Sequence, residues 1–347
     1  MGYEFRGNTY RNLAELKQWA AKRQEDALEP DLPVIDPHHH QWDDARGPYL
    51  IRELAEDVAT GHNIVATIFI ECGAMYRARG PEDMKPVGEV EFVNGMAAMS
   101  ASGKYGKSRL CNVIIGHADL TLGDRAKPVL EALIQAGNGR FRGIRHGVTW
   151  DTGNAARFGR HSVPQHQVLD PVFRKGFAHL KPLGLTFESW QFHPQLPDTV
   201  DLLRAFPETS VILNHCGGLL GIPPHDGSRD EVFKVWRRNM SELAQFPHLA
   251  VKVGGLGMLY CGWDFHLGHV PPSSEELAAA WRPYVETCIE LFGANRCMME
   301  SNFPVDKQTC GYGVLWNALK RITKNCSAAE KTALYSGTAA RVYRMQV

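Results

Sequence analysis

Short apolar runs recur eight times along the chain, and stretches with helical periodicity separate them. The runs are nearly continuous in apolar character, as expected for strands of a parallel sheet that is covered on both faces. Eight such strands alternating with helices predict a single (β/α)8 TIM barrel. The runs lie at 33–36, 64–71, 110–115, 141–148, 184–190, 210–214, 249–255 and 296–301, and the helical stretches include 50–60, 125–136, 168–181, 198–206, 230–246 and 275–292.

An open doubly wound sheet is the structural alternative to the barrel. It is disfavoured because no G-x-G-x-x-G turn follows the first run, and the glycines of 254–257 follow a late run without that spacing. A chain of 347 residues with 44% hydrophobic residues can bury the core of such a barrel. We expect residues 1–30 to form an N-terminal helical extension, with an amphipathic helix at 10–27. Residues 31–347 then form the barrel, with a closing helix at 328–345.

Charge and cysteine usage exclude several classes of function. Lys+Arg and Asp+Glu balance at 38 each, without a basic block, so neither nucleic acid nor an anionic membrane is an expected partner. No apolar run approaches the roughly 20 residues that span a bilayer. The eight cysteines form no C-x-x-C pair, and no apolar export segment begins the chain, so the cytoplasm is the expected compartment. Assembly into a homo-oligomer is left open.

Three histidines follow the first apolar run, in the segment Asp36-Pro37-His38-His39-His40. Successive side chains of a strand point to opposite faces, so His38 and His40 share one face and His39 takes the other. Two imidazoles on one face can bind a metal ion or polarise a substrate oxygen.

Further polar residues lie where the other runs end. In a (β/α)8 barrel these ends meet at one mouth, where the chemistry takes place. Histidines at three different strand ends form a group that scattered structural histidines would rarely produce. The residues concerned are His38, His40, Glu71, Arg142, Arg145, Trp190, His193, His215, Lys252, Glu300 and Asn302.

These motifs, taken together and in this order, resemble the amidohydrolase superfamily (amidohydrolase family 2). The first is Asp36, His38, His40 and Trp42, in the pattern D-x-H-x-H-x-W. The others are Gly143-Ile144-Arg145, His193-Pro194-Gln195-Leu196, Asn214-His215-Cys216-Gly217 and Ser301-Asn302-Phe303-Pro304-Val305. Within the superfamily the chain is most similar to the lactonases that act on sugar lactones and 2-pyrone-4,6-dicarboxylate lactones.

One position departs from the pattern of that family, because Asn302 stands where the resemblance implies a catalytic aspartate. An amide has no site that accepts a proton at neutral pH, so the base must be found elsewhere. The candidates are Glu71, Glu300, Asp306 and one of the histidines. Asn302 would then donate a hydrogen bond or offer a neutral oxygen ligand.

The resemblance permits two kinds of site. In one, His38, His40, His193 and His215 hold one divalent metal ion such as Zn²⁺, which lowers the pKa of bound water to about 7. In the other, catalysis is metal-independent, and imidazoles donate hydrogen bonds to the substrate carbonyl. No lysine ends the fourth run, so a bridged binuclear site is not expected. We expect Lys252 to orient polar groups.

The expected substrate is a small acidic molecule. The planar fork of arginine matches a carboxylate, so one or both of Arg142 and Arg145 could bind the substrate. We favour Arg145 as the residue that faces the substrate, with Arg142 pairing with a carboxylate of the barrel. Trp42 and Trp190 would form apolar walls.

These features predict a hydrolase that opens a small, carboxylated lactone or a related cyclic ester in the catabolism of sugars or aromatic compounds. The alternative is a metal-dependent decarboxylase or carbon–carbon hydrolase of the same superfamily. A barrel that binds without catalysis is a third reading, which the four histidines disfavour.

Overall fold

The computed structural model describes residues 5–153, 155 and 163–346 and contains one sheet of eight parallel strands. The strands pair in chain order, and a bridge between His39 and Phe303 brings the last strand end to the first. The predicted (β/α)8 barrel is therefore confirmed. The strands are β1 (Val34–His39), β2 (Ile64–Ile70), β3 (Arg109–Gly116), β4 (Phe141–Arg145), β5 (Thr186–Ser189), β6 (Val211–Leu213), β7 (Leu249–Val253) and β8 (Cys297–Met299).

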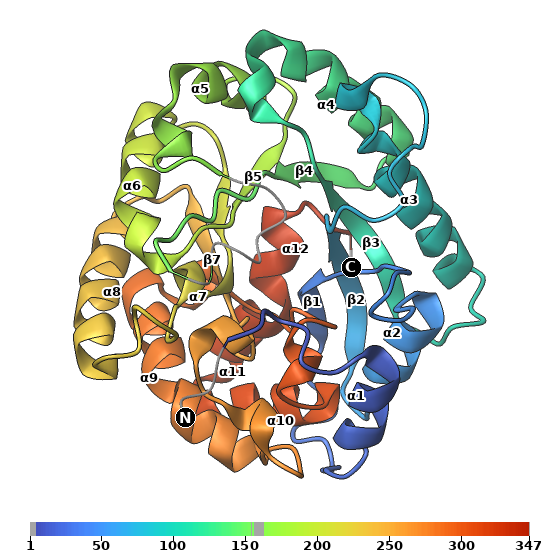
Figure 1. The fold of residues 1–347 in the computed structure, drawn as a ribbon. Coiled ribbons are helices and arrows are strands. Elements are labelled where there is room, and N and C mark those ends of the chain that lie inside the picture. The colour runs from blue at the N-terminus through green and yellow to red at the C-terminus, as the bar shows by residue number, and fades with distance from the viewer. Residues whose placement is uncertain (1–4, 154, 156–162, 347) are drawn as a thin grey trace.

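Helices surround the strands as an outer ring (Figure 1). Three of them, α3, α7 and α10, were not among the helical stretches named from the sequence. In α3 the residues Phe92, Met96 and Met99 add apolar side chains outside the buried stripe, so no single face stands out. The helices are α2 (Ile51–Val58), α3 (Val87–Ala101), α4 (Ala126–Ala136), α5 (Pro171–Phe177), α6 (Leu196–Ala205), α7 (His215–Gly218), α8 (Arg229–Leu243), α9 (Ser274–Phe292) and α10 (Tyr312–Ile322).

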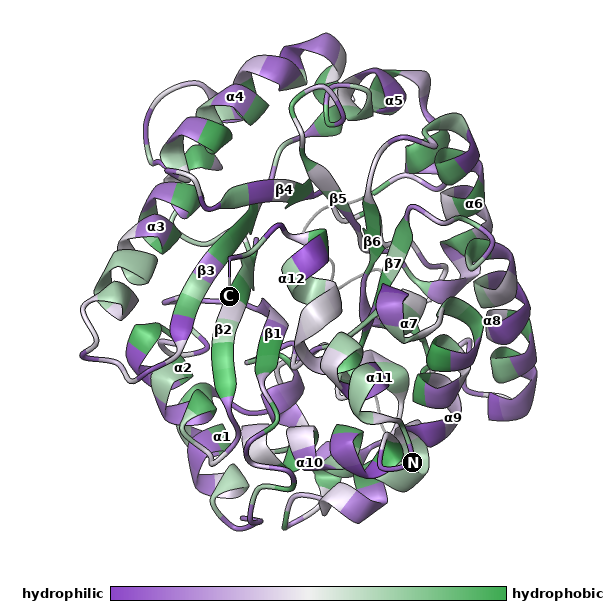
Figure 2. Cartoon of the chain, turned by 180° about the vertical axis from the view of Figure 1, so that it is seen from behind, coloured by the Kyte–Doolittle hydropathy of each residue, from purple (hydrophilic) through white to green (hydrophobic). Residues whose placement is uncertain are grey.

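The C-terminal segment closes the barrel at the end where the strands begin. It runs through α11 (Ala328–Thr332), a π-helical turn (Ala333–Gly337) and α12 (Thr338–Val342), close to the closing helix expected at 328–345. Ala339 and Tyr343 pack in one cluster with inward-facing residues of the strands, such as Ile35 and Ile68. In both views α12 lies at the centre of the ring of strands, whose apolar character is visible in Figure 2.

The N-terminal extension packs against the loops of the barrel. Its helix α1 (Leu13–Ala20) is shorter than the expected 10–27, because a capping box of Asn12 and Glu15 begins the helix at Leu13. Trp19 donates a hydrogen bond to the carbonyl of Gly268, at 2.9 Å. The division at residues 30 and 31 stays a prediction, and residues 1–4 and 347 of the two expected segments lie outside the described residues.

No helix in the described part of the chain combines the length and the apolar composition that a membrane crossing requires. The expected cytoplasmic location stays a prediction.

Candidate active site

A cavity of about 330 Å³ opens where the strands end, and residues that follow each of the eight strands line it. This is the end of the barrel at which the sequence placed the chemistry. Several of the expected residues are among those that line it: His40, Trp42, Glu71, Arg145, Trp190, His215 and Asn302.

Two histidines at the end of β1 turn toward each other, as the alternation of strand side chains predicted. Nε2 of His38 lies 3.3 Å from Nε2 of His40. Nδ1 of His40 lies 2.9 Å from the carbonyl oxygen of Ile70, so this nitrogen carries a proton and Nε2 is left with a lone pair. His39 faces the other way, with Nε2 at 2.9 Å from Oγ1 of Thr67. The expected separation of His39 from the other two is confirmed.

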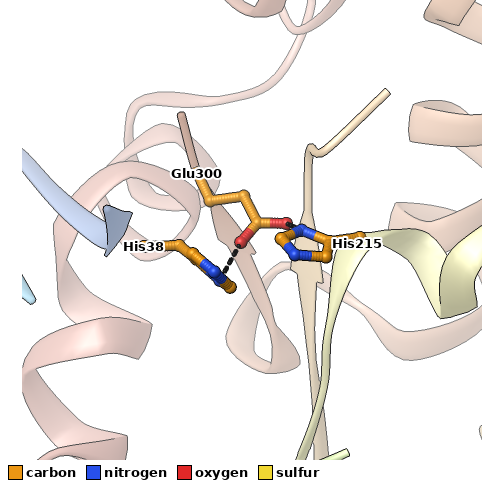
Figure 3. A group of neighbouring side chains, drawn as sticks. All are labelled: His38, His215 and Glu300. Atoms are coloured by element: carbon orange, nitrogen blue, oxygen red, sulfur yellow. Dashed lines mark hydrogen bonds and ion pairs between the residues drawn. The ribbon is translucent and has the colours of Figure 1, made fainter. Parts of the chain in front are cut away.

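The carboxylate of Glu300 lies between two histidine rings (Figure 3). Its Oε1 lies 2.8 Å from Nδ1 of His215, and its Oε2 lies 2.9 Å from Nδ1 of His38. Burial raises the pKa of Glu300 to about 8, although the charge of Lys252 opposes this shift. Glu300 lies close to both rings, and its hydrogen bond to Nδ1 fixes the orientation of His215.

His215 owes its position to an unusual backbone. It follows β6 at the start of α7 with φ of 53°, in the left-handed region. A Cβ atom at Gly255, which follows β7, would lie 2.4 Å from Nδ1 of His215, so only glycine leaves room for the ring. The ring of Trp190 meets His215 edge-on, with centroids 4.8 Å apart. Burial lowers the pKa of His215 well below its ordinary value, so the ring is neutral at pH 7.

A buried network of charges lies beneath the histidines, inside the barrel. Nζ of Lys252 lies 2.8 Å from Oε2 of Glu188 and 3.5 Å from Nδ1 of His38, and all three side chains are fully buried. The Tyr343 hydroxyl, from the C-terminal segment, also bonds to Glu188. Lys252 therefore orients polar groups, as expected. Sequence reasoning did not assign roles to Glu188 and Tyr343, because no motif links the C-terminal segment to β5.

Arg145, at the end of β4, is held by Glu71. Its Nε donates to Oε1 of Glu71 and its NH2 donates to the Glu71 carbonyl, both at 2.7 Å. NH1 lies 3.3 Å from Nε2 of His38. Glu71 therefore occupies the Nε–NH2 edge of Arg145, which could otherwise form two hydrogen bonds to a substrate carboxylate. The same ion pair makes Glu71 a poor candidate for the base, because its carboxylate is already neutralised.

Asn302 adopts a left-handed conformation, with φ of 54°, directly after β8. Its Nδ2 donates to Oδ1 of Asp306 at 2.7 Å. Its Oδ1 is buried and bonds to none of the described residues, although Asn302 lines the cavity. Asp306 also accepts a bond from the backbone N–H of Gly257, at 2.8 Å, and burial raises its pKa well above the ordinary value. Asp306 therefore orients Asn302 through this hydrogen bond and is not among the residues that line the cavity.

The structure does not bring His193 to the other three histidines. Pro194 follows it in a short 3-10 turn (His193–Gln195), and Nδ1 of His193 accepts a bond from the backbone N–H of Leu220, at 3.2 Å. Its ring lies 5.3 Å from that of His225, which bonds to Asp151. His193 belongs to a second cluster and is not among the residues that line the cavity.

Arg142 lies near the start of β4, at the opposite end of the strand from Arg145. Its guanidinium donates to the backbone carbonyls of Gly139, Phe141 and Tyr343. The expectation that it pairs with a barrel carboxylate is therefore wrong. Three residues of a strand span about 10 Å, so Arg142 contacts the C-terminal segment at the closed end of the barrel.

The two tryptophans form walls of the cavity, as expected. Trp42 stacks on His40, with ring centroids 6.3 Å apart, and the guanidinium of Arg46 covers its ring at 3.6 Å. Trp190 contacts His215. The two tryptophans thus contact different histidines of the group.

The donor set fits one divalent cation. His38, His215 and Glu300 each offer one ligand atom, and these atoms lie within 4.8 Å of one another. Oε2 of Glu300 is buried and makes no aligned hydrogen bond within the described chain, so a lone pair is unused. Two imidazoles and a carboxylate are a ligand set that zinc accepts. This set differs from the expected one, because Glu300 replaces His193, while His40 borders the group.

The amidohydrolase family model matches residues 35–345. Among curated proteins, the uncharacterized protein y4mH of Sinorhizobium fredii is 32% identical over 338 residues, which cover 91% of this chain and 99% of the relative. An L-fucono-1,5-lactonase of Burkholderia multivorans is 27% identical over 237 residues, which cover 67% of this chain and 71% of the relative.

Solved structures share the fold. An amidohydrolase of Burkholderia multivorans with bound zinc aligns with a TM-score of 0.67 and 24% identity, covering 90% of this chain and 99% of that one. The 5-carboxyvanillate decarboxylase of Sphingomonas paucimobilis aligns with a TM-score of 0.53 and 14% identity, covering 91% of this chain and 100% of that one. At these identities the likeness shows the barrel and not the reaction.

Proposed function

The chain is a member of the amidohydrolase family, an enzyme of the hydrolase type, and we propose that it opens a small, carboxylated lactone or related cyclic ester by hydrolysis. The observation that carries the proposal is the pair formed by Glu300 and His215 at the cavity, with Arg145 and His38 in contact beside it. The lactonase relative supports this substrate class.

Hydrolysis of a lactone needs a polarised carbonyl and an activated water. NH1 of Arg145 and Nε2 of His38 lie 3.3 Å apart, so a carbonyl oxygen beside them would receive a hydrogen bond from the guanidinium. Guanidinium charge stabilises the oxyanion that develops as water attacks the carbonyl carbon. The ring C–O bond then breaks, and the product is a hydroxy acid.

For a metal-independent site, we assign the base to His215. Its Nδ1 bonds to Glu300, which leaves Nε2 to accept a proton from the attacking water. Its lowered pKa keeps this nitrogen unprotonated at neutral pH. The unpartnered Oδ1 of Asn302, which cannot serve as a base, would accept a hydrogen bond from the same water and so orient it.

In the metal-dependent alternative, a divalent cation such as Zn²⁺ would be held by His38, His215 and Glu300. His215 would then be a ligand and not the base, and the cation would polarise the carbonyl and acidify water. Metal analysis of the purified protein would identify a bound metal ion. Turnover before and after dialysis against a chelator would show whether catalysis requires it.

We infer a small acidic molecule as the substrate, and we keep a homo-oligomer as a prediction. Neither nucleic acid nor a membrane is expected as a partner.

The test is turnover of two substrate types. Purified protein is incubated with L-fucono-1,5-lactone and 2-pyrone-4,6-dicarboxylate, and acid release is followed in a weakly buffered indicator assay. Carbon dioxide release from 5-carboxyvanillate is measured in parallel, because a decarboxylase of the same fold makes that reaction the alternative. Acid release without carbon dioxide supports a lactonase. Release of carbon dioxide, with both lactones left intact, would contradict the lactonase proposal and favour a decarboxylase.

A further inference from the structure

The segment Phe5–Leu13, which precedes the barrel, forms part of the cavity wall. We name these residues the strap. The family model begins at residue 35, so the strap lies outside the part of the chain that matches the family. It brings the following residues to the cavity: Gly7, Asn8, Thr9, Arg11 and Leu13.

Specific hydrogen bonds tie the strap to loops that follow β7 and β8. Oδ1 of Asn8 accepts a bond from the backbone N–H of Leu259, at 2.7 Å. The side-chain amide of Gln308 bonds to both backbone groups of Arg11, accepting from N–H at 3.0 Å and donating to the carbonyl at 2.7 Å. The ring of Phe5 packs on Tyr260, another lining residue, with centroids 4.8 Å apart. The strap is thus a fixed wall of the cavity.

The arginines that line the cavity differ in whether a carboxylate pairs with them. Three arginines line it, and two of them have a carboxylate partner: Arg145 pairs with Glu71, and Arg46 pairs with Asp44. Among the described residues, Arg11 has no such partner. One of its N–H groups donates to the carbonyl of His266, at 2.6 Å.

The aromatic neighbours of Arg11 leave its donors available. Its guanidinium carbon lies 4.8 Å from the centroid of Tyr10 and 4.5 Å from that of Trp19. These contacts are not hydrogen bonds, and the guanidinium makes one hydrogen bond to the described residues, so it has further N–H donors for an acceptor. Arg11 is therefore a partly buried cation with unused donors at the wall of the cavity.

We propose that Arg11 forms an anion subsite, in which the strap binds a carboxylate of the substrate remote from the carbonyl that reacts. The inference rests on the proposed function and names the residue that selects acidic substrates. It also accounts for Arg145, whose two-donor edge is taken by Glu71 and which acts at the reacting carbonyl instead.

The test measures binding of two non-reacting probes by calorimetry, isophthalate with two carboxylates and benzoate with one. In Arg11→Gln we expect isophthalate to bind about ten- to a hundredfold more weakly, the range for loss of a charge-assisted hydrogen bond, while benzoate changes less than threefold. The control is Arg23→Gln. Arg23 also donates to a backbone carbonyl, that of Pro271, but it is not among the lining residues, so neither probe should change.

A second variant separates charge from the anchoring of the strap. Gln308→Met removes both bonds to the Arg11 backbone and leaves the charge in place, so it should weaken both probes by similar factors. Equal weakening of the two probes in Arg11→Gln would overturn the proposal, and so would failure of isophthalate to bind the unaltered protein. Selective loss of isophthalate in a protein that hydrolyses no lactone would refute the proposed function and leave the subsite standing.

Discussion

Oε1 of Glu300 lies 2.8 Å from Nδ1 of His215, and both side chains are buried. The Oε1 atom in this position accepts the Nδ1 proton and leaves Nε2 as the basic nitrogen of the ring. Glu300 thereby determines which nitrogen of the imidazole can accept a proton from a substrate or water. This relationship carries the first two predictions.

Glu300→Gln is expected to lower kcat about 100-fold or more, the scale of a positioned general base. The amide can donate a hydrogen bond as well as accept one, so it no longer selects a single tautomer of His215. The measurement is steady-state kinetics on the lactone that the unaltered protein hydrolyses. Glu131→Gln, on the exposed surface of α4, is the matched control, with unchanged kcat. A variant as active as its parent would show that Glu300 is only structural.

The same substitution predicts a change in how stability depends on pH. Burial raises the pKa of Glu300 from its ordinary 4.5 to about 8, so the folded state holds a proton that the unfolded state has lost between these values. This contribution to stability is present below pH 4.5 and is lost as the pH rises to about 8. The amide of the variant has no such proton. The free energy of unfolding of the parent, relative to Glu300→Gln, should fall by at least about 1 kcal/mol between pH 5 and pH 8. Urea unfolding at both values measures it, and a constant difference would contradict the raised pKa.

Asn302→Ala is expected to lower kcat about tenfold or more, because it removes the oxygen that orients water and the bond to Asp306. Asn302→Asp should retain or raise turnover, since Asp306 favours its protonated form and can share a proton with a carboxylate beside it. Kinetics of both variants, with melting temperatures as the control for folding, decide this. If Asn302→Asp abolishes activity in a folded protein, the base mechanism of the family cannot be transferred to this chain.

Arg145→Lys should lower kcat about ten- to a hundredfold, more than it raises KM. An ammonium cannot bond at once to the side chain and carbonyl of Glu71 while also presenting a donor beside His38. A KM effect alone, on an acidic lactone, would return Arg145 to the role of carboxylate anchor that the sequence suggested. Unchanged kinetics would remove Arg145 from the site altogether.

His39→Ala should cost stability before activity. His39 is fully buried, bonds to Thr67 and packs against Phe69, with ring centroids 6.1 Å apart. Loss of this packing and of the bond should reduce the free energy of unfolding by about 2–4 kcal/mol. Activity below the melting transition should stay within about twofold of the parent. A large loss of kcat with an unchanged melting temperature would contradict the outward orientation of His39.

Strand periodicity determined much of the site in advance. It predicted that His38 and His40 share a face, because adjacent strand residues must alternate, and it predicted that β1, β2, β4, β6 and β8 end at one mouth. The local sequence could not show how each ring turns after its strand ends. His193 is directed to Leu220 by the turn at Pro194, and Arg142 sits too far back along β4 to reach the mouth.

The sequence by itself determined the barrel, the order of its elements and the mouth at which His215, Glu300 and Asn302 meet, because these follow from periodicity along the chain. Only the tertiary structure decided which groups touch. Glu300 contacts both His38 and His215, and the strap, far from them in sequence, supplies Arg11 to the same cavity. Such contacts depend on the closure of the barrel and on which loops the N-terminal extension crosses. Neither leaves a periodic signal in the sequence, because both arise from packing between distant segments.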